Sequence, residues 1–249
     1  MVLELIIIAT MIVSLISLVG VALFSAGKKK IERFLFYIVS FSIGTLLGAA
    51  LFDLLPESIA GSGAEAALEL AFFGLLSAFV MEKIIHWHHH HVASEKEHTH
   101  PLGTLTLVGD GFHNFFDGVA IAAAFIVSTP LGITTTIAIS LHEIPQEIGD
   151  FGLLLYSGYS RGKALLFNLI SALTAVAGGL LFFFFSGAVE HVESYALAFT
   201  AGMFLYIASA DLLPELHKEK RAKRSLVQLA LILLGAALIW LIARTLEVG

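Results

Sequence analysis

The chain has 249 residues, of which 57% are hydrophobic and only 14% are charged. A soluble domain carries roughly 25% charged residues, so this composition and a mean hydropathy of +0.89 exclude an ordinary soluble domain and indicate an integral membrane protein. The net charge of −6 gives no sign of a nucleic-acid partner, and the absence of cysteine excludes disulfides and thiolate metal sites.

Apolar segments of membrane-spanning length fill most of the chain, because a transmembrane helix needs about 20 mostly apolar residues. We predict eight spans, at residues 3–26, 34–56, 66–86, 103–128, 131–156, 163–186, 194–214 and 226–247. The first has its basic cluster after the apolar run, the reverse of a secretory signal, so we interpret it as a retained helix. The fold class predicted is an all-α integral membrane protein, with residues 1–249 forming one transmembrane domain.

Basic residues indicate the orientation of these spans. Thirteen of the 14 lie in or directly beside the connections after the first, third, fifth and seventh segments, whereas the opposite connections contain Glu57, Glu65, Glu190 and Glu193. Cytoplasmic loops are enriched in Lys and Arg. We therefore predict that both termini are extracytoplasmic, and we expect a prokaryotic plasma membrane.

The sequence Asp-Leu-Leu-Pro-Glu occurs twice, at residues 53–57 and 211–215. The predicted topology places the first copy near the outer face and the second near the inner face. We interpret segments one to three and six to eight as inverted repeats around segments four and five, a 3+2+3 arrangement with a binding site near the midplane. The alternative is that this sequence is simply a convenient helix end.

Polar side chains interrupt segments four and five at mid-depth. The first set is Asp110, His113, Asn114 and Asp117, and the second is His142, Glu143, Gln146, Glu147 and Asp150. The first set has the spacing i, i+3, i+4, i+7 of one helical face. Because a charge at the helix centre costs roughly 2.5–3.5 kcal/mol, such residues usually mark an ion or substrate path. A purely structural polar network is the alternative.

Pro145 interrupts the backbone hydrogen bonding of segment five. A helix-interior proline removes one hydrogen bond, here leaving the Leu141 carbonyl free beside His142. Within a membrane, something else must satisfy that carbonyl. A metal, a water molecule or a neighbouring helix can do so.

The ligand types narrow the ion, because imidazole, carboxylate and amide groups without thiolate suit Zn²⁺, Fe²⁺ and Mn²⁺. Two other functions stay open. His142 and Glu143 begin a sequence similar to the HExxH motif of zinc hydrolases, although the second His is replaced by Gln146. An intramembrane metallohydrolase and a metal sensor that moves no ions are therefore the alternatives to a transporter.

The motifs HNFFDG (113–118) and HEIPQEIGDF (142–151) resemble the fourth- and fifth-helix motifs of the ZIP family of divalent metal transporters, closest to the branch with histidine-rich loops. The resemblance implies a transporter rather than an enzyme, a homodimer in the lipid bilayer, and uptake toward the cytosol. It also implies a binuclear metal centre. His113, His142 and Gln146 would belong to one subsite, and Asn114, Asp117 and Glu143 mainly to the other.

Further positions follow from the same resemblance. We include Glu147 among the metal ligands, and Asn168 on segment six is carried over as an additional polar group. This branch usually has His where the chain has Gln146. An amide is a weaker ligand than imidazole, so we expect a broader substrate range than Zn²⁺ alone, including Fe²⁺, Mn²⁺ or Cd²⁺.

Residues 87–102 are predicted to form a histidine-rich cytosolic loop. Seven of the chain's 11 histidines lie in or beside it: His86, His88, His89, His90, His91, His98 and His100. Such tracts bind metal by composition. We interpret this one as a regulatory metal loop, with a flexible linker of incidental metal affinity as the alternative.

Overall fold

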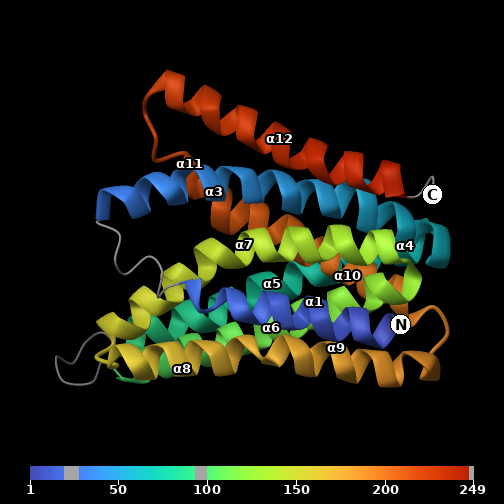
Figure 1. Ribbon diagram of the computed structural model, residues 1–249, viewed down its shortest axis with the longest axis horizontal. Helices are drawn as coiled ribbons and strands as arrows, with labels where there is room; N and C mark the ends of the chain where they lie inside the picture. Colours follow the sequence, from blue (N-terminus) through green and yellow to red (C-terminus); the bar gives the residue numbers. More distant parts are fainter. Residues whose placement is uncertain (20–27, 93–99, 247–249) are drawn as a thin grey trace.

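The protein is a bundle of long helices running along a common axis (Figure 1). The computed structural model describes residues 1–19, 28–92 and 100–246, and these residues contain no strand. The α-helices are α1 Val2–Ile16, α3 Lys28–Ala49, α4 Leu55–Ser62, α5 Ala64–Val92, α6 His100–Val127, α7 Thr129–Tyr156, α8 Arg161–Ala172, α9 Thr174–Phe185, α10 Val192–Tyr206, α11 Leu213–Leu216 and α12 Ala222–Leu246. The predicted all-α class is confirmed.

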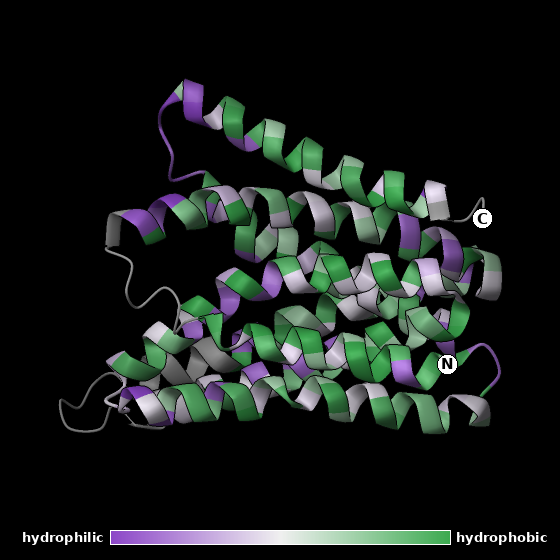
Figure 2. Cartoon of the chain, in the orientation of Figure 1, coloured by the Kyte–Doolittle hydropathy of each residue, from purple (hydrophilic) through white to green (hydrophobic). Residues whose placement is uncertain are grey.

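Several of these helices are suited to cross a bilayer. Five helical stretches qualify by length and composition: Lys30–Ser62, Ala64–Ile84, Arg161–Ala188, Val192–Leu216 and Ala222–Thr245. Large apolar side chains such as Leu226, Leu233 and Leu241 are exposed, and hydrophobic residues make up much of every long helix (Figure 2). An apolar surface this extensive is expected of a protein whose solvent is lipid. The chain is therefore an integral membrane protein.

The remaining three predicted spans are helical but differ from these five. Helices α6 and α7 have 28 residues each, and their buried polar side chains lower their mean hydropathy. Helix α1 has only 15 residues, so it is shorter than the predicted segment 3–26, whose last residues lie outside the described part of the chain.

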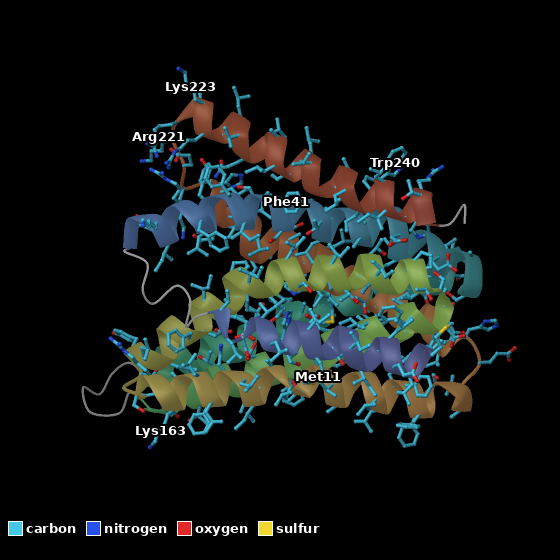
Figure 3. The ribbon with its side chains drawn as sticks, in the orientation of Figure 1. Met11, Phe41, Lys163, Arg221, Lys223 and Trp240 are labelled. Atoms are coloured by element: carbon cyan, nitrogen blue, oxygen red, sulfur yellow. The ribbon has the colours of Figure 1, made fainter. Side chains whose placement is uncertain are left out.

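Basic side chains gather at one end of the bundle. The start of α1 and the end of α12 lie together at the other end (Figure 1). Lys163, Arg221 and Lys223 all lie away from those two chain ends (Figure 3). The charge segregation read from the sequence thus corresponds to a real separation in space.

Helical structure extends into the stretch assigned to the histidine-rich loop. Helix α5 continues through Val92, and α6 begins at His100. Within the predicted tract, His98 falls in 93–99, outside the described residues. The side chains of His86, His88, His89, His90, His91 and His100 likewise lie outside the described part of the structure.

The two Asp-Leu-Leu-Pro-Glu copies have the same local structure. Each begins inside a wide π-helical turn, Ala50–Leu54 for the first copy and Ile207–Leu212 for the second. Asp53 accepts a hydrogen bond from Thr134 near the start of α7, whereas Asp211 lines the same cavity as Leu153 near its end. The two copies therefore face different parts of α7: Asp53 bonds Thr134, and Asp211 faces the cavity lined by residues 142–153.

The helices of the bundle pack in close pairs, with α6 against α9, α5 against α10 and α3 against α12. A Cβ atom on Gly118 of α6 would lie 1.9 Å from the Ala175 carbonyl oxygen of α9. Conversely, a Cβ atom on Gly178 would lie 2.0 Å from the Phe115 carbonyl oxygen. Small residues of this kind let membrane helices approach closely enough for backbone contact.

We predict that Gly118→Ala lowers the thermal stability of the detergent-purified protein, because the added methyl group overlaps the α9 backbone. Overpacking of this kind costs about 1–3 kcal/mol. Gly152→Ala on α7 is the control, since a Cβ atom there has no neighbour within 4 Å. Equal melting temperatures for the two variants would contradict this account of the α6–α9 contact.

Candidate metal centre

Helices α6 and α7 form a tight antiparallel pair that carries the polar residues. Ser128 joins them, and its Oγ accepts a hydrogen bond from the Leu131 N–H in the first turn of α7. This capping bond satisfies one of the backbone donors left free at a helix N-terminus. The short connection places the middle of α6 beside the middle of α7.

Four side chains converge between these helices. His113 and Asp117 come from α6, and His142 and Glu143 come from α7. The Nε2 atoms of the two histidines are 3.2 Å apart. His113 Nε2 lies 3.2 Å from Glu143 Oε1 and 3.7 Å from Asp117 Oδ2, and His142 Nε2 lies 3.5 and 3.4 Å from the same two oxygens.

These separations match the edges of a tetrahedral zinc site. With Zn–N and Zn–O bonds of about 2.0–2.1 Å, the ligand atoms of a tetrahedron lie about 3.3–3.4 Å apart. Five of the six pairwise distances are 3.2–3.7 Å, and all four atoms lie within 4.8 Å of one another. The four donor atoms could therefore hold one small divalent cation.

Burial supports the same reading. His142, Asp117 and Glu143 are at most 2% exposed. Among the described residues, Asp117 Oδ2 and both Glu143 carboxylate oxygens are buried without a hydrogen-bond partner. A buried, unpaired carboxylate oxygen is costly, and a coordinated cation is one of the few groups that can compensate it.

A second cluster adjoins the first and consists of carboxylates alone. One oxygen each of Asp110, Glu143 and Glu147 lie within 4.8 Å of one another, so Glu143 belongs to both clusters. Asp110 Oδ1 accepts hydrogen bonds from Asn114 Nδ2 at 2.9 Å and from Gln146 Nε2 at 3.3 Å. Oxygen ligands without imidazole suit a harder cation than the histidine cluster does.

Helix α8 completes this second cluster from the side. Ser171 Oγ donates to Asp110 Oδ2, and Asn168 Nδ2 donates to Glu147 Oε2. Both donors precede a break between α8 and α9, where Thr174 Oγ1 bonds the Gly111 carbonyl of α6 at 2.6 Å. These contacts fix the carboxylates in the way that hydrogen bonds to metal ligands usually do.

The structure groups the predicted ligands differently from the resemblance. Asp117 lies with the two histidines rather than mainly in the other subsite, and the amide nitrogen of Gln146 is engaged by Asp110. Asp110 enters a cluster although it was not assigned as a ligand. Its signal was its place on the same helical face as His113, four residues before Asn114.

The carbonyl left free by Pro145 is satisfied by a neighbouring helix. Ser42 Oγ of α3 donates to the Leu141 carbonyl oxygen at 2.6 Å. Of the three partners considered from the sequence, the structure therefore shows a hydroxyl from another helix.

A cavity of about 1060 Å³ reaches the metal centre from one end of the bundle. His113, His142 and Asp110 line its inner part, and Asp150 and Asp211 lie further along its wall. Its outermost lining includes Glu32, Lys218 and Glu219, at the end where the basic residues gather. An ion bound at the centre can thus reach that end past acidic side chains.

Glu219 is held in its charged form at the mouth of this cavity. Its carboxylate accepts hydrogen bonds from Arg221 Nε at 2.8 Å and from Arg224 Nη1 at 3.1 Å. The hydrogen bond from Arg221 is the main cause that lowers the pKa of Glu219 to about 2. The carboxylate stays ionised at any physiological pH.

The opposite side of the centre is closed by packed apolar side chains. Leu46, Ile121, Ala138 and Ile139 are fully buried there, and the Phe204 ring lies edge-on to His142 with 5.8 Å between ring centroids. The described residues thus leave the centre open toward one end of the bundle and closed toward the other.

Comparison with known proteins agrees with this geometry. The sequence matches the ZIP zinc transporter family over residues 2–105 and 100–243. This chain belongs to that family. It is 37% identical over 218 residues to zinc transporter ZIP13 of Pongo abelii, an alignment covering 80% of the chain and 63% of the relative. It is 43% identical over 143 residues to zinc transporter zipt-7.2 of Caenorhabditis elegans, covering 56% and 31% respectively.

A third relative is zinc transporter ZIP10 of Homo sapiens, 38% identical over 141 residues that cover 52% of the chain and 17% of the relative. This member of the ZIP family thus spans less than two thirds of the length of the curated relatives that it matches. The motifs on α6 and α7 fall inside the matched region 100–243.

Because Glu143 belongs to both clusters, we predict that substitutions of different ligands change the number of bound Zn²⁺ ions differently. We expect the purified protein to bind two Zn²⁺ ions, His142→Ala to lose the histidine cluster alone, and Glu143→Gln to weaken both. Calorimetric titration in detergent measures the stoichiometry. One undisturbed site in Glu143→Gln would show that this carboxylate is not shared.

Proposed function

We propose that this protein transports divalent transition-metal ions, Zn²⁺ first among them, through the centre between α6 and α7. The observation that carries the proposal is the convergence of four donor atoms, at the edge lengths of a zinc tetrahedron, at the inner end of a cavity. A storage or structural site has no need of a route to one end of the bundle. The named function of the relatives, zinc transport, supports the same conclusion.

The proposed topology has eight spans in a 3+2+3 arrangement, with segments one to three and six to eight as inverted repeats. The placement of Asp53 and Asp211 beside different parts of α7 supports the repeat, and the shared end of α1 and α12 supports an even number of spans. With the basic end in the cytoplasm, both termini are extracytoplasmic and the cavity opens inward. The prokaryotic plasma membrane and a homodimer within the bilayer are part of this proposal.

The transport cycle follows from this arrangement. The proposed ligands are His113, Asn114, Asp117, His142, Glu143, Gln146, Glu147 and Asn168, with Asp110 added by its place in the second cluster. In the inward-facing state, an ion leaves the histidine cluster past Asp110 and Asp150 toward the cavity mouth. Closing this route and parting the apolar side around Phe204 would expose the same ligands outward, which is alternating access.

The histidine-rich tract is proposed to receive ions from the cavity. It covers the end of α5, the connection to α6 and the first residue of α6. Glu82 of α5 and Thr106 of α6 both line the cavity wall. Besides Zn²⁺, the proposed substrates are Fe²⁺, Mn²⁺ and Cd²⁺, because Gln146 replaces an imidazole by an amide, which is a weaker ligand for Zn²⁺.

The metallohydrolase alternative is not favoured. The second histidine of HExxH is absent, and Gln146 in its place bonds Asp110 instead of turning to His142. The histidine cluster also has a full set of four protein donors, whereas a catalytic zinc keeps one position for water.

We expect His113→Ala and His142→Ala each to abolish zinc uptake, because each removes one of the four donors of the histidine cluster. Flux of radioactive zinc into proteoliposomes measures this. His217→Ala is the matched control, since His217 is exposed and lies outside the cavity lining. Near-normal flux in both cluster variants would refute the assignment, and zinc-dependent peptide cleavage without flux would favour the hydrolase.

Replacing the amide on α7 by imidazole tests the origin of ion selectivity. We expect Gln146→His to tighten Zn²⁺ binding and to reduce competition by Fe²⁺ and Mn²⁺, because imidazole is the stronger zinc ligand. Competition among these ions for zinc flux is the measurement. Unchanged competition would mean that position 146 does not contribute to selectivity.

A further inference from the structure

A single hydroxyl joins α3 to the part of α7 that carries the metal ligands. Ser42 is fully buried, and its Oγ lies 2.6 Å from the Leu141 carbonyl oxygen. The same Oγ lies 2.8 Å from the carbonyl oxygen of Ile38, one turn earlier in α3. A serine has only one hydroxyl hydrogen to donate, so these two carbonyls compete for it.

The two carbonyls differ in their other partners. Within α3, the Ile38 carbonyl is in the position to accept the backbone N–H four residues later, as in any α-helix. The corresponding partner of Leu141 would be residue 145, which is Pro145 and has no N–H. The carbonyl of Leu141 therefore depends on the hydroxyl far more than the carbonyl of Ile38 does.

The position of this carbonyl links the bond to the metal centre. Leu141 C=O belongs to the peptide unit whose other half is the backbone nitrogen of His142. The ring of that histidine is held on its far side by a 3.2 Å contact between Nδ1 and the Ala138 carbonyl oxygen. The neighbouring Glu143 is the carboxylate shared by both clusters. A rotation of this peptide would shift both ligands.

We propose that Ser42 is a positioning residue of the metal centre. It holds the Leu141 carbonyl that Pro145 leaves free, and thereby fixes the peptide that precedes the two α7 ligands. This inference rests on the proposed role of His142 and Glu143 as zinc ligands. It assigns to α3, which supplies no ligand, a direct influence on metal affinity.

The test is a double-mutant cycle on zinc affinity in the purified full chain. We expect Ser42→Ala to raise the zinc dissociation constant about tenfold, within the range seen when groups that orient metal ligands are removed. In a Pro145→Ala background the alanine N–H can bond the Leu141 carbonyl. The same Ser42→Ala substitution should then leave the dissociation constant unchanged, and the cycle isolates that coupling.

Ser40→Ala is the matched control. Ser40 is also fully buried in α3, but among the described residues its Oγ bonds the carbonyl of its own helix at Phe36, at 2.7 Å, and no atom of α7. We expect this variant to bind zinc like the unmodified protein. If it weakens zinc binding as much as Ser42→Ala does, loss of any buried hydroxyl from α3 explains the effect and the proposal is overturned.

Other outcomes are equally decisive. A lower melting temperature for Ser42→Ala with an unchanged zinc dissociation constant indicates a purely structural role and overturns the proposal. An equal loss of zinc affinity with Pro145 and with Pro145→Ala also overturns it. If Ser42→Ala alone does not fold, recovery of folding and zinc binding in the double variant supports the proposal, and its failure to recover overturns it. Absence of zinc flux in the unmodified protein would refute the transport function while leaving this cycle interpretable.

Discussion

The structure depends on burying several carboxylates and imidazoles at the same depth between α6 and α7. Each such charge costs roughly 2.5–3.5 kcal/mol at the centre of a membrane helix when it has no partner. Asp117 Oδ2 and both carboxylate oxygens of Glu143 have no hydrogen-bond partner among the described residues, and imidazole nitrogens of His113 and His142 lie 3.2–3.7 Å from Asp117 Oδ2 and Glu143 Oε1. Such an arrangement is unfavourable in the metal-free protein and favourable around a divalent cation. The burial of unpaired carboxylates therefore both opposes folding of the metal-free protein and favours binding of the ion.

The positions of these carboxylates and imidazoles must be fixed by contacts between the helices, because lipid cannot fix them. Because lipid tails are as apolar as the helices, packing and hydrogen bonds must hold a membrane bundle together. The reciprocal glycine contacts of α6 and α9 bring two backbones into contact, and Thr174, Ser171 and Ser42 add hydroxyl bonds between helices. These three hydroxyls lie beside the second cluster or the peptide before His142, and Ser58 and Thr134 make similar bonds between helices elsewhere. Hydroxyl bonds therefore help to hold the helices together both at the ligands and away from them.

Much of the site could be predicted from the sequence, because periodicity on a single helix determines which residues share a face. Asp110, His113 and Asp117 follow such a spacing, and the free carbonyl at Leu141 follows from Pro145 alone. The all-α membrane fold likewise followed from composition, and the family from two motifs. These inferences are local, and each needs only one segment and its neighbours.

Sequence reasoning could not determine how the helices are rotated against one another. That rotation groups Asp117 with the histidines, turns Gln146 toward Asp110, and brings Ser42 and Ser171 from other helices to their acceptors. For the predicted segment 3–26, the described residues show helix α1 over Val2–Ile16, and the last part of the segment lies outside the described residues. The number of spans and the set of ion ligands therefore remain predictions. The spacing of polar residues identifies candidate ligands, and helix packing determines which of them lie close together.

The π-helical turns in which the two Asp-Leu-Leu-Pro-Glu copies begin have a mechanical consequence. Such a turn accommodates one residue more than a regular α-turn, so the helix beyond it is offset from the helix before it. One residue corresponds to a rotation of about 100° about the helix axis. If the π-helical turn moved by one residue along the chain, the side chain of Asp53 or Asp211 would rotate about the helix axis to a different face. The helix would remain continuous. Each of these two helices can thus rotate its aspartate by shifting the π-helical turn along the chain, without breaking the helix.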